Sequence, residues 1–192
     1  MNTVSASNRR VVVCNGEGAP TGTAGVLEVH QGAGILHKAF SVFVFRNTGT
    51  EILLQQRSRQ KKLFALRWAN TCCSHPSRAD ELVSERAERR LFEELGFSVP
   101  LREAGSFVYR ATDPNADLSE YEHDTVLVGE AAADVSVKPD PAEIAAWRWM
   151  SVAGLQHDLH ANGDRYAPWL PEALRIALGA RAGSSAAGPA DG

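Results

Sequence analysis

The sequence predicts a mixed α/β fold, in which helices flank a mixed sheet to form a sandwich. Short runs rich in β-branched and aromatic residues alternate with a few helical stretches, and this alternation is typical of that class. The chain has 192 residues, of which 44% are hydrophobic, so one domain with a substantial core is expected. We predict that this domain covers residues 10–180, after a flexible segment over 1–9. The alanine-, glycine- and serine-rich residues 181–192 are expected to form a disordered tail.

The expected strands and helices follow from local composition and turn residues. Strand-like runs cover residues 10–14, 39–46, 51–57, 105–111, 124–130 and 146–150. The second and third runs are joined by the turn Asn47-Thr48-Gly49-Thr50, which predicts a hairpin. Helical stretches cover residues 80–95, 152–159 and 171–180. Gly96 is expected to end the first helix, because glycine readily adopts a positive φ angle.

The helix over residues 80–95 has a clear apolar stripe with charges at its edge. At about 100° per residue, the stripe is formed by Val83, Ala87, Leu91 and Leu95. Arg90 and Glu94 lie beside this stripe, where a charge is costly unless it is paired or solvated by a site. Two interpretations follow: an ion pair within the helix, stabilising by a few tenths of a kcal/mol, or a pair of functional residues.

The composition argues against several classes of partner and location. The formal net charge is −3, which provides no global attraction for nucleic acid or an anionic membrane. No apolar run approaches the length of a membrane span, and no secretory signal is visible. We therefore predict a cytoplasmic protein without nucleic-acid or membrane partners. Its three cysteines are too few for a disulfide framework, and buried thiols are the plain alternative to reactive ones.

A divalent metal site is the first chemical hypothesis. Three histidines and two carboxylates are candidate ligands: His30, His37, His75, Glu120 and Glu122. If residues 120–122 are extended, both carboxylates point to the same face, because side-chain direction repeats every two residues in a strand. Such a set suits Mn²⁺, Mg²⁺ or Zn²⁺. A histidine alone is more often a surface or core residue than a ligand, so the hypothesis depends on all five residues together.

Proton transfer and anion binding are the second and third hypotheses. Cys73 and Glu122 have side chains with unperturbed pKa values of about 8.5 and 4.3, which nearby charges or a metal would retune. The alternative for Glu122 is a solvated strand carboxylate. A basic cluster of Arg57, Arg59, Lys61 and Lys62 follows a strand. Such a cluster alone is more often a solvated loop than a phosphate site, but together with Arg90 it could clamp a diphosphate.

These motifs together resemble the type I isopentenyl-diphosphate isomerases, a branch of the Nudix fold. The resemblance covers about residues 10–175, and its combination of Cys-x-His-Pro, Tyr-Arg-Ala and Glu-x-Glu is specific. The matching segments are Pro20-Thr21-Gly22-Thr23, His30, His37, Arg57, Lys61-Lys62, Trp68-Ala69-Asn70-Thr71-Cys72-Cys73-Ser74-His75-Pro76, Tyr109-Arg110-Ala111-Thr112-Asp113-Pro114, Glu120-Tyr121-Glu122 and Pro168-Trp169. The resemblance implies a Nudix-type α/β/α sandwich with a mixed sheet.

The helix departs from the Nudix box in a way that disfavours hydrolysis. It keeps the box residues Glu81, Arg89, Glu93, Glu94 and Gly96. His75 replaces the opening glycine, and Arg90 stands where the box has a glutamate. Losing a carboxylate and gaining a cation weakens a metal cluster that would activate water. An arginine at that position can instead hold a diphosphate without cleaving it.

The resemblance implies conversion of isopentenyl diphosphate to dimethylallyl diphosphate through a tertiary carbocation. The implied catalytic residues are Cys73, Glu122, Tyr109 and Trp169, and the implied diphosphate contacts are Arg57, Lys61 and Arg90. The metal site is expected at His30, His37, His75, Glu120 and Glu122, with a second ion, Mg²⁺, bridging Glu94 and the diphosphate. A further basic position of the family falls in residues 24–29, which contain no basic residue here. Cys72 has no implied role.

Two other functions compete with the isomerase hypothesis. One is a metal-dependent Nudix hydrolase of nucleoside or prenyl diphosphates, and the other is a binding module that has lost turnover. Arg90 and an otherwise unused Cys73 weigh against hydrolysis, while nothing is missing from the proton-transfer pair. We therefore expect an isomerase with a small-molecule substrate, acting as a monomer or weak homodimer.

Overall fold

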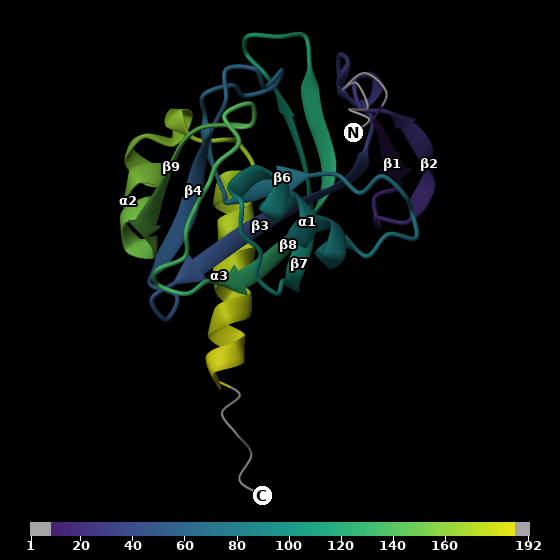
Figure 1. Cartoon of the computed structure of the whole chain (residues 1–192). Helices are drawn as coiled ribbons and strands as arrows, with labels where there is room; N and C mark the ends of the chain where they lie inside the picture. Colours follow the sequence, from purple (N-terminus) through teal and green to yellow (C-terminus); the bar gives the residue numbers. More distant parts are fainter. Residues whose placement is uncertain (1–8, 187–192) are drawn as a thin grey trace, which may run out of the picture.

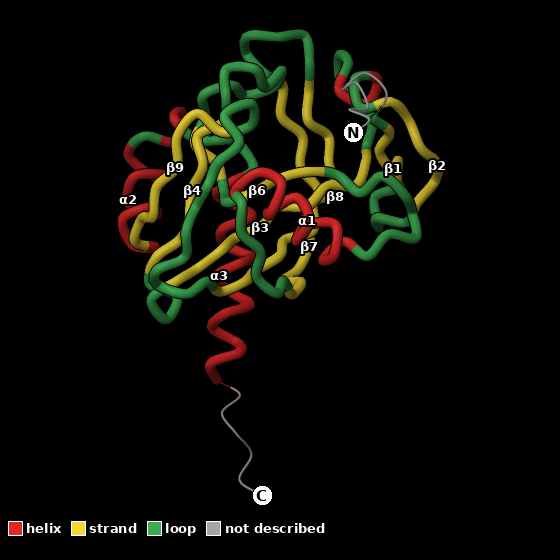
Figure 2. The backbone as a smooth tube through the Cα atoms, viewed as in Figure 1, coloured by secondary structure: helices red, strands yellow, loops and turns green. Residues whose placement is uncertain are grey.

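A computed structural model describes residues 9–186 and confirms the predicted sandwich with a mixed sheet (Figures 1 and 2). The strands are β1 (Arg10–Cys14), β2 (Pro20–Gly25), β3 (His37–Arg46), β4 (Glu51–Arg57), β5 (Trp68–Ala69), β6 (Cys72–Ser74), β7 (Arg102–Thr112), β8 (Ser119–Glu130) and β9 (Ile144–Ser151). The helices are α1 (Val83–Leu95), α2 (Val152–Ala161) and α3 (Leu170–Ala186), with short 3₁₀ turns η2 (Glu28–His30) and η3 (Gly163–Arg165).

Strand β3 is the centre of the sheet. It pairs in parallel with β8 from His37↔Glu122 to Phe45↔Glu130. It also pairs antiparallel with β1, β4 and β6. Strand β8 continues into the antiparallel pair with β7, and β4 pairs with β9. Because β3 is surrounded on both edges and both faces, a nearly continuous apolar sequence is expected of it, and its run Phe-Ser-Val-Phe-Val-Phe satisfies that expectation.

Alternate side chains of β3 enter two separate cores. Val42 and Val44 pack in one core with Ala87, Leu91 and Leu95 of α1. Phe43 and Phe45 pack in the other core, which includes Leu155 of α2 and Leu170 of α3. In Figure 1, β3 passes between α1 and α3. The two-residue period of the strand thus produces the helix–sheet–helix layering.

The expected strands and helices all form, but several boundaries differ. Helix α1 begins at Val83 rather than at residue 80, because the Glu81 carboxylate accepts hydrogen bonds from Ser77 N and Arg89 and holds the preceding turn. Strands β2, β5 and β6 were not predicted. Strand β8 begins five residues early, at Ser119, and so includes the Glu-x-Glu pair. Gly96 ends α1 in the left-handed conformation, with φ of 73°.

The predicted tail is corrected over part of its length. Residues 181–186 belong to α3, since alanine-rich sequence continues a helix readily. Residues 187–192 and 1–8, on which the predicted tail and flexible N-terminus otherwise fall, lie outside the described residues. Over the described range, none of the helices combines the length and apolarity needed to cross a membrane.

Candidate active site

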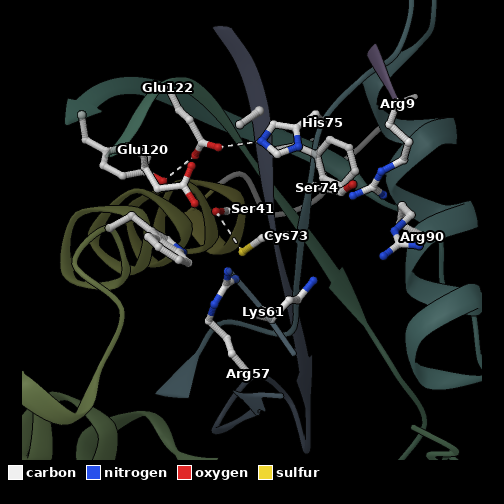
Figure 3. Close-up of a pocket in the computed structure, with 14 residues that line it drawn as sticks. Arg9, Ser41, Arg57, Lys61, Cys73, Ser74, His75, Arg90, Glu120 and Glu122 are labelled. Carbon is white, nitrogen blue, oxygen red and sulfur yellow. Dashed lines mark hydrogen bonds and ion pairs between the residues drawn. The ribbon is translucent and has the colours of Figure 1, made fainter. Parts of the chain in front are cut away.

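The pairing of β6 with β3 decides which of the two adjacent cysteines faces the pocket. Cys73 lies opposite Ser41, and Cys72 lies opposite Val42. Directly opposite residues share a face, and consecutive residues point to opposite faces. Cys72 is therefore fully buried in the core beneath α1, whereas Cys73 lines a pocket on the other face. In Figure 3 the Cys73 sulfur points to the middle of this pocket, between Ser41 and Arg57.

The position of Glu122 is determined by both neighbours of β8. His37 is its partner across the parallel pair with β3, and Tyr109 is its partner across the antiparallel pair with β7. The Tyr109 hydroxyl donates a hydrogen bond to Glu122 Oε2. Glu120 follows the same face of β8, two residues away, as its expected extended conformation requires.

Three histidines converge on these carboxylates from three different elements. His30 belongs to η2, His37 begins β3, and His75 follows β6. His30 Nε2 lies 2.8 Å from Glu120 Oε2, and His75 Nε2 lies 2.8 Å from Glu122 Oε1. One ligand atom from each of the five residues falls within 4.8 Å of all the others. The structure thus brings together the complete predicted ligand set.

The orientation of the imidazole rings fits a metal ion. His37 Nδ1 lies 2.8 Å from the carbonyl oxygen of Ile35, and His30 Nδ1 similarly contacts the carbonyl of Val26. A carbonyl accepts, so each Nδ1 carries a proton and each Nε2 is left to face the carboxylates. His37 Nε2 is buried and has no hydrogen-bond partner. A buried lone pair beside two carboxylates is costly without a cation, so the residues present fit a divalent ion.

The protonation states of the cluster are set by burial and by mutual contacts. Burial lowers the pKa of His75 to about 4. Burial opposes ionisation of Glu122, but the neighbouring His37 and His75 imidazoles more than compensate and hold its pKa well below the usual range. Burial likewise opposes the charge on His30, yet Glu120 raises the pKa of His30 to about 9, so His30 would release its Nε2 proton on binding a metal. A neutral His75 and an ionised Glu122 are the forms that bind metals.

Asn70 connects the thiol with the buried tryptophan. Its amide nitrogen donates to the carbonyls of Val42 and Cys72 at 3.1 and 3.0 Å, which turns its carbonyl oxygen towards the pocket. That oxygen accepts from Cys73 Sγ at 3.1 Å and from Trp169 Nε1 at 3.0 Å. All hydrogen-bonding groups of the fully buried amide are therefore used. Burial raises the pKa of the Cys73 thiol to about 12, so the thiol is protonated at neutral pH.

Aromatic rings form one wall of the pocket. Trp169, just before α3, is 3% exposed and packs against Phe64 and Tyr109, with ring centroids 5.7 and 5.9 Å away. The guanidinium carbon of Arg57 lies 5.3 Å from the Trp169 ring centroid. These rings bring negative π faces to the region around the Cys73 sulfur, where a developing positive charge would be stabilised.

The basic residues of the pocket pair with a carboxylate that the sequence did not suggest, Glu143. Arg57, Lys61 and Arg90 all line the pocket, as predicted for diphosphate contacts. Lys61 pairs with Glu143, which lies just before β9, and Arg90 Nη2 lies 3.2 Å from the same residue. Burial raises the pKa of Glu143, but Lys61 more than offsets this and lowers it to about 2. Glu143 is therefore ionised.

Glu94 is not among the residues lining the pocket. It is 1% exposed and accepts a hydrogen bond from Arg90 Nη2. The Arg90–Glu94 ion pair, which was the alternative to a functional role for these two residues, is thus present. Arg90 nevertheless also lines the pocket. His30 and His37 lie behind the pocket wall, while His75, Glu120, Glu122, Tyr109, Trp169 and Cys73 line it.

Sequence reasoning missed four residues near the site: Asn70, Asp124, Glu143 and Arg9. Asp124 accepts a 2.7 Å hydrogen bond from Ser41, whose hydroxyl also lies 3.7 Å from the Cys73 sulfur. The sequence signal for Asp124 was its position two residues after Glu122, which places both side chains on the same face of β8. Asn70 and Glu143 gave no periodic signal, since each makes its contacts to residues distant in the sequence.

Comparison with known proteins finds a matching domain family and similar sequences. Residues 35–170 match the NUDIX domain model. An isopentenyl-diphosphate Delta-isomerase from Halorhodospira halophila is 45% identical over 159 residues, which cover 83% of this chain and 89% of the relative. The isopentenyl-diphosphate Delta-isomerase of Nocardia farcinica is 46% identical over 160 residues, with the same two coverages.

Solved structures agree in fold at much lower sequence identity. A Deinococcus radiodurans protein has a TM-score of 0.65 at 18% identity, covering 88% of this chain and 98% of that protein. A MutT protein from Methanosarcina mazei has a TM-score of 0.56 at 20% identity, covering 78% and 95%. These similarities concern the arrangement of strands and helices.

Removing a ligand of the histidine cluster should weaken binding of a divalent ion. We expect His37→Ala and Glu120→Gln each to lower Mn²⁺ affinity by more than about tenfold, since even residues behind metal ligands contribute roughly 10–100-fold. Isothermal titration with Mn²⁺ measures this. His123→Ala is the matched control, because His123 lies on β8 beside Glu122 but outside the cluster. Unchanged affinity in both ligand variants would contradict the site.

Glu143 should stabilise the fold in a pH-dependent way. Its folded pKa of about 2 lies below the ordinary 4.5, so its contribution is complete above pH 4.5 and is lost as the pH falls towards 2. We expect Glu143→Gln to lower the free energy of unfolding at pH 7 by about 1–3 kcal/mol, because Lys61 and Arg90 lose a charged partner. Urea unfolding measured from pH 7 to pH 2.5 tests this.

The difference between the wild type and Glu143→Gln should shrink through the acidic range. Glu103→Gln, which alters an exposed carboxyl on β7, should change stability by less than about 0.5 kcal/mol at every pH. A Glu143→Gln effect that stays constant down to pH 2.5 would show that the lost stability does not arise from the ionised carboxylate.

Proposed function

The chain belongs to the isopentenyl-diphosphate Delta-isomerase family of NUDIX-domain proteins, and we propose that Cys73 and Glu122 carry out the two proton transfers of its reaction. The enzyme isomerises isopentenyl diphosphate to dimethylallyl diphosphate. The assignment of Cys73 and Glu122 to these transfers rests on one observation. A thiol and a carboxylate line the same pocket between an aromatic wall and a basic side.

The reaction needs two proton transfers at neighbouring carbons. A proton adds to the terminal carbon of the alkene, and the positive charge forms at the tertiary carbon. The adjacent methylene then loses a proton, and its electron pair forms the new double bond. An acid and a base on opposite faces of the substrate suit this sequence, provided that both lie within reach of the reacting carbons. Cys73 and Glu122 are the proposed groups, with Tyr109 assisting through its hydrogen bond to Glu122.

Trp169 is the proposed partner of the carbocation. The contact of its Nε1–H with Asn70 holds the ring in position. An aromatic face stabilises an adjacent cation by about 0.5–2 kcal/mol, with the larger values in a dry site. Because Trp169 is buried and Tyr109 is half-buried, these rings help to keep water that would capture the carbocation away from this part of the pocket.

Two divalent ions complete the proposal. His30, His37, His75, Glu120 and Glu122 would hold one ion, either Mn²⁺, Mg²⁺ or Zn²⁺, which would orient Glu122 and tune its acidity. Glu94 would help to hold Mg²⁺ bound to the diphosphate, together with the cations Arg57, Lys61 and Arg90. Glu94 already pairs with Arg90, so in that role its carboxylate would bind both Arg90 and the ion.

The hydrolase alternative is weaker for a specific reason. Arg90, in place of the glutamate of the Nudix box, lies against Glu93, Glu94 and Glu143 and contributes a positive charge there. A cation at this position disfavours the clustering of several metal ions that activates a hydrolytic water. Arg90 instead supports binding of an intact diphosphate.

The activity is tested by incubating the purified protein with isopentenyl diphosphate and Mg²⁺ in deuterated water. We expect NMR spectra to show dimethylallyl diphosphate that carries deuterium, because the proton added to the alkene comes from a group that exchanges with solvent. No phosphate should be released. Free phosphate or a prenyl monophosphate as the main product would establish hydrolysis instead.

The two cysteines provide a matched pair for testing the proton-transfer group. We expect Cys73→Ala to abolish turnover, lowering kcat by at least about 100-fold, which is typical for loss of a proton-transfer group, while Mn²⁺ binding is retained. Cys72→Ala should remain active and lose about 1 kcal/mol of stability, because Cys72 packs in the core under α1. Steady-state kinetics and urea unfolding measure the two effects. Equal losses of activity would mean that the thiol assignment is wrong.

A further inference from the structure

We propose that Arg9 is an additional diphosphate-binding residue. The inference rests on the proposed function, since it names a further contact for the same substrate. Arg9 precedes β1, far in the sequence from Arg57, Lys61 and Arg90, yet its side chain lines the same pocket. Figure 3 shows its guanidinium group directed to the side of the pocket where Arg90 lies.

The backbone holds Arg9 at a defined place. Its carbonyl oxygen accepts a 2.8 Å hydrogen bond from the Val26 N–H, so Arg9 lies beside the segment that contains no basic residue. Arg9 and Val26 also line a neighbouring cavity together with Ser74 and His75. The Arg9 side chain therefore starts beside residues 24–29 and lines the pocket from there.

The other basic residues of the pocket are already engaged with acceptors. Arg90 contacts three carboxylates, and Lys61 shares Glu143 with it. The Arg57 guanidinium donates two hydrogen bonds to the Leu63 carbonyl, at 3.2 and 2.9 Å. Within residues 9–186, no hydrogen bond or ion pair is found for the Arg9 guanidinium. Its five N–H donors are free for a ligand.

Charge balance favours an anion as that ligand. Glu94 and Glu143 are both buried or half-buried beside Lys61 and Arg90 and cancel much of their positive charge. A diphosphate ester carries more than one negative charge, so the pocket requires positive charge beyond these compensated pairs. Arg9 contributes one uncompensated charge in a planar donor fork that matches phosphate oxygens.

Arg10 offers an internal contrast. It is the next residue, but consecutive residues of an extended segment point to opposite sides. Its guanidinium is bound to Thr23, with Nε 3.0 Å and Nη2 2.8 Å from Thr23 Oγ1. Arg10 is therefore committed to the β1–β2 pair, and it is absent from the residues that line the pocket.

The expected effect is on binding rather than on the chemical step. A diphosphate contact is the same in the ground state and in the transition state, so its loss raises KM and leaves kcat nearly unchanged. A charged hydrogen bond corresponds to roughly 10–100-fold in affinity. Pyrophosphate binding should weaken by the same factor, because the contact involves no part of the alkene.

The experiment uses the full chain with Arg9→Ala, Arg9→Lys and Arg10→Ala. Isothermal titration with inorganic pyrophosphate and Mg²⁺ gives Kd, and isomerase kinetics give KM and kcat. We expect Arg9→Ala to raise Kd and KM roughly 10–100-fold, with kcat within about twofold. Arg9→Lys should restore part of the affinity, because it keeps the charge but not the fork. Arg10→Ala should change Kd less than about threefold.

The outcomes separate this inference from the proposed function. An Arg9-dependent Kd for pyrophosphate supports the contact even if isopentenyl diphosphate is not turned over, in which case only the function would fail. Turnover with Kd and KM unaffected by Arg9→Ala would overturn the contact and leave the function intact. The contact would also be overturned if the wild-type protein bound no pyrophosphate. The same holds if Arg9→Ala and Arg10→Ala, with equal melting temperatures, lost pyrophosphate affinity equally.

Discussion

The parallel pairing of β3 with β8 is the constraint on which the rest of the structure depends. It aligns His37 with Glu122 at one end and Phe45 with Glu130 at the other. A shift of one residue would turn every side chain of β8 to the opposite face, moving Glu120 and Glu122 away from the histidines and Val126 out of its core. The same alternation on β3 sends Val42 to α1 and Ser41 to the pocket. The core that stabilises the fold therefore also specifies the register of the site.

The site concentrates buried charge at two places, and a thiol and two aromatic rings line the pocket between them. At one place the His30 and His75 imidazoles contact Glu120 and Glu122, and at the other Arg90 and Lys61 balance Glu94 and Glu143. Such charges are tolerated inside a protein only when each has a close partner. Cys73, Trp169 and Tyr109 lie between the two places, joined through Asn70 and Glu122. This division suits a substrate with an anionic head and a hydrocarbon tail that becomes cationic during the reaction.

The comparison with other Nudix proteins separates fold from chemistry. Structures with 18–20% identity share the arrangement of strands and helices, yet a fold supports different reactions according to the side chains placed on it. Two departures from the Nudix box bear on the chemistry here. Arg90 replaces a glutamate on α1, and His75 replaces the glycine that opens the Nudix box. Cys73 then occupies the pocket face of β6, where its neighbours are hydrogen-bonding and aromatic groups.

The sequence by itself determined the class of fold, the central strands, the apolar stripe of α1 and the residue types of the site. These features depend on local periodicity or on short motifs, which a linear sequence contains. It did not predict β2, β5 or β6, and β5 and β6, with two and three residues, are too short to show a period. Only the tertiary structure supplied the physical reason for choosing Cys73 over Cys72, because the faces of β6 are defined by its pairing with β3. It also brought Arg9, Asn70 and Glu143 to the pocket through contacts between distant segments. Such contacts are decided by the packing of the whole core, and no local pattern encodes them.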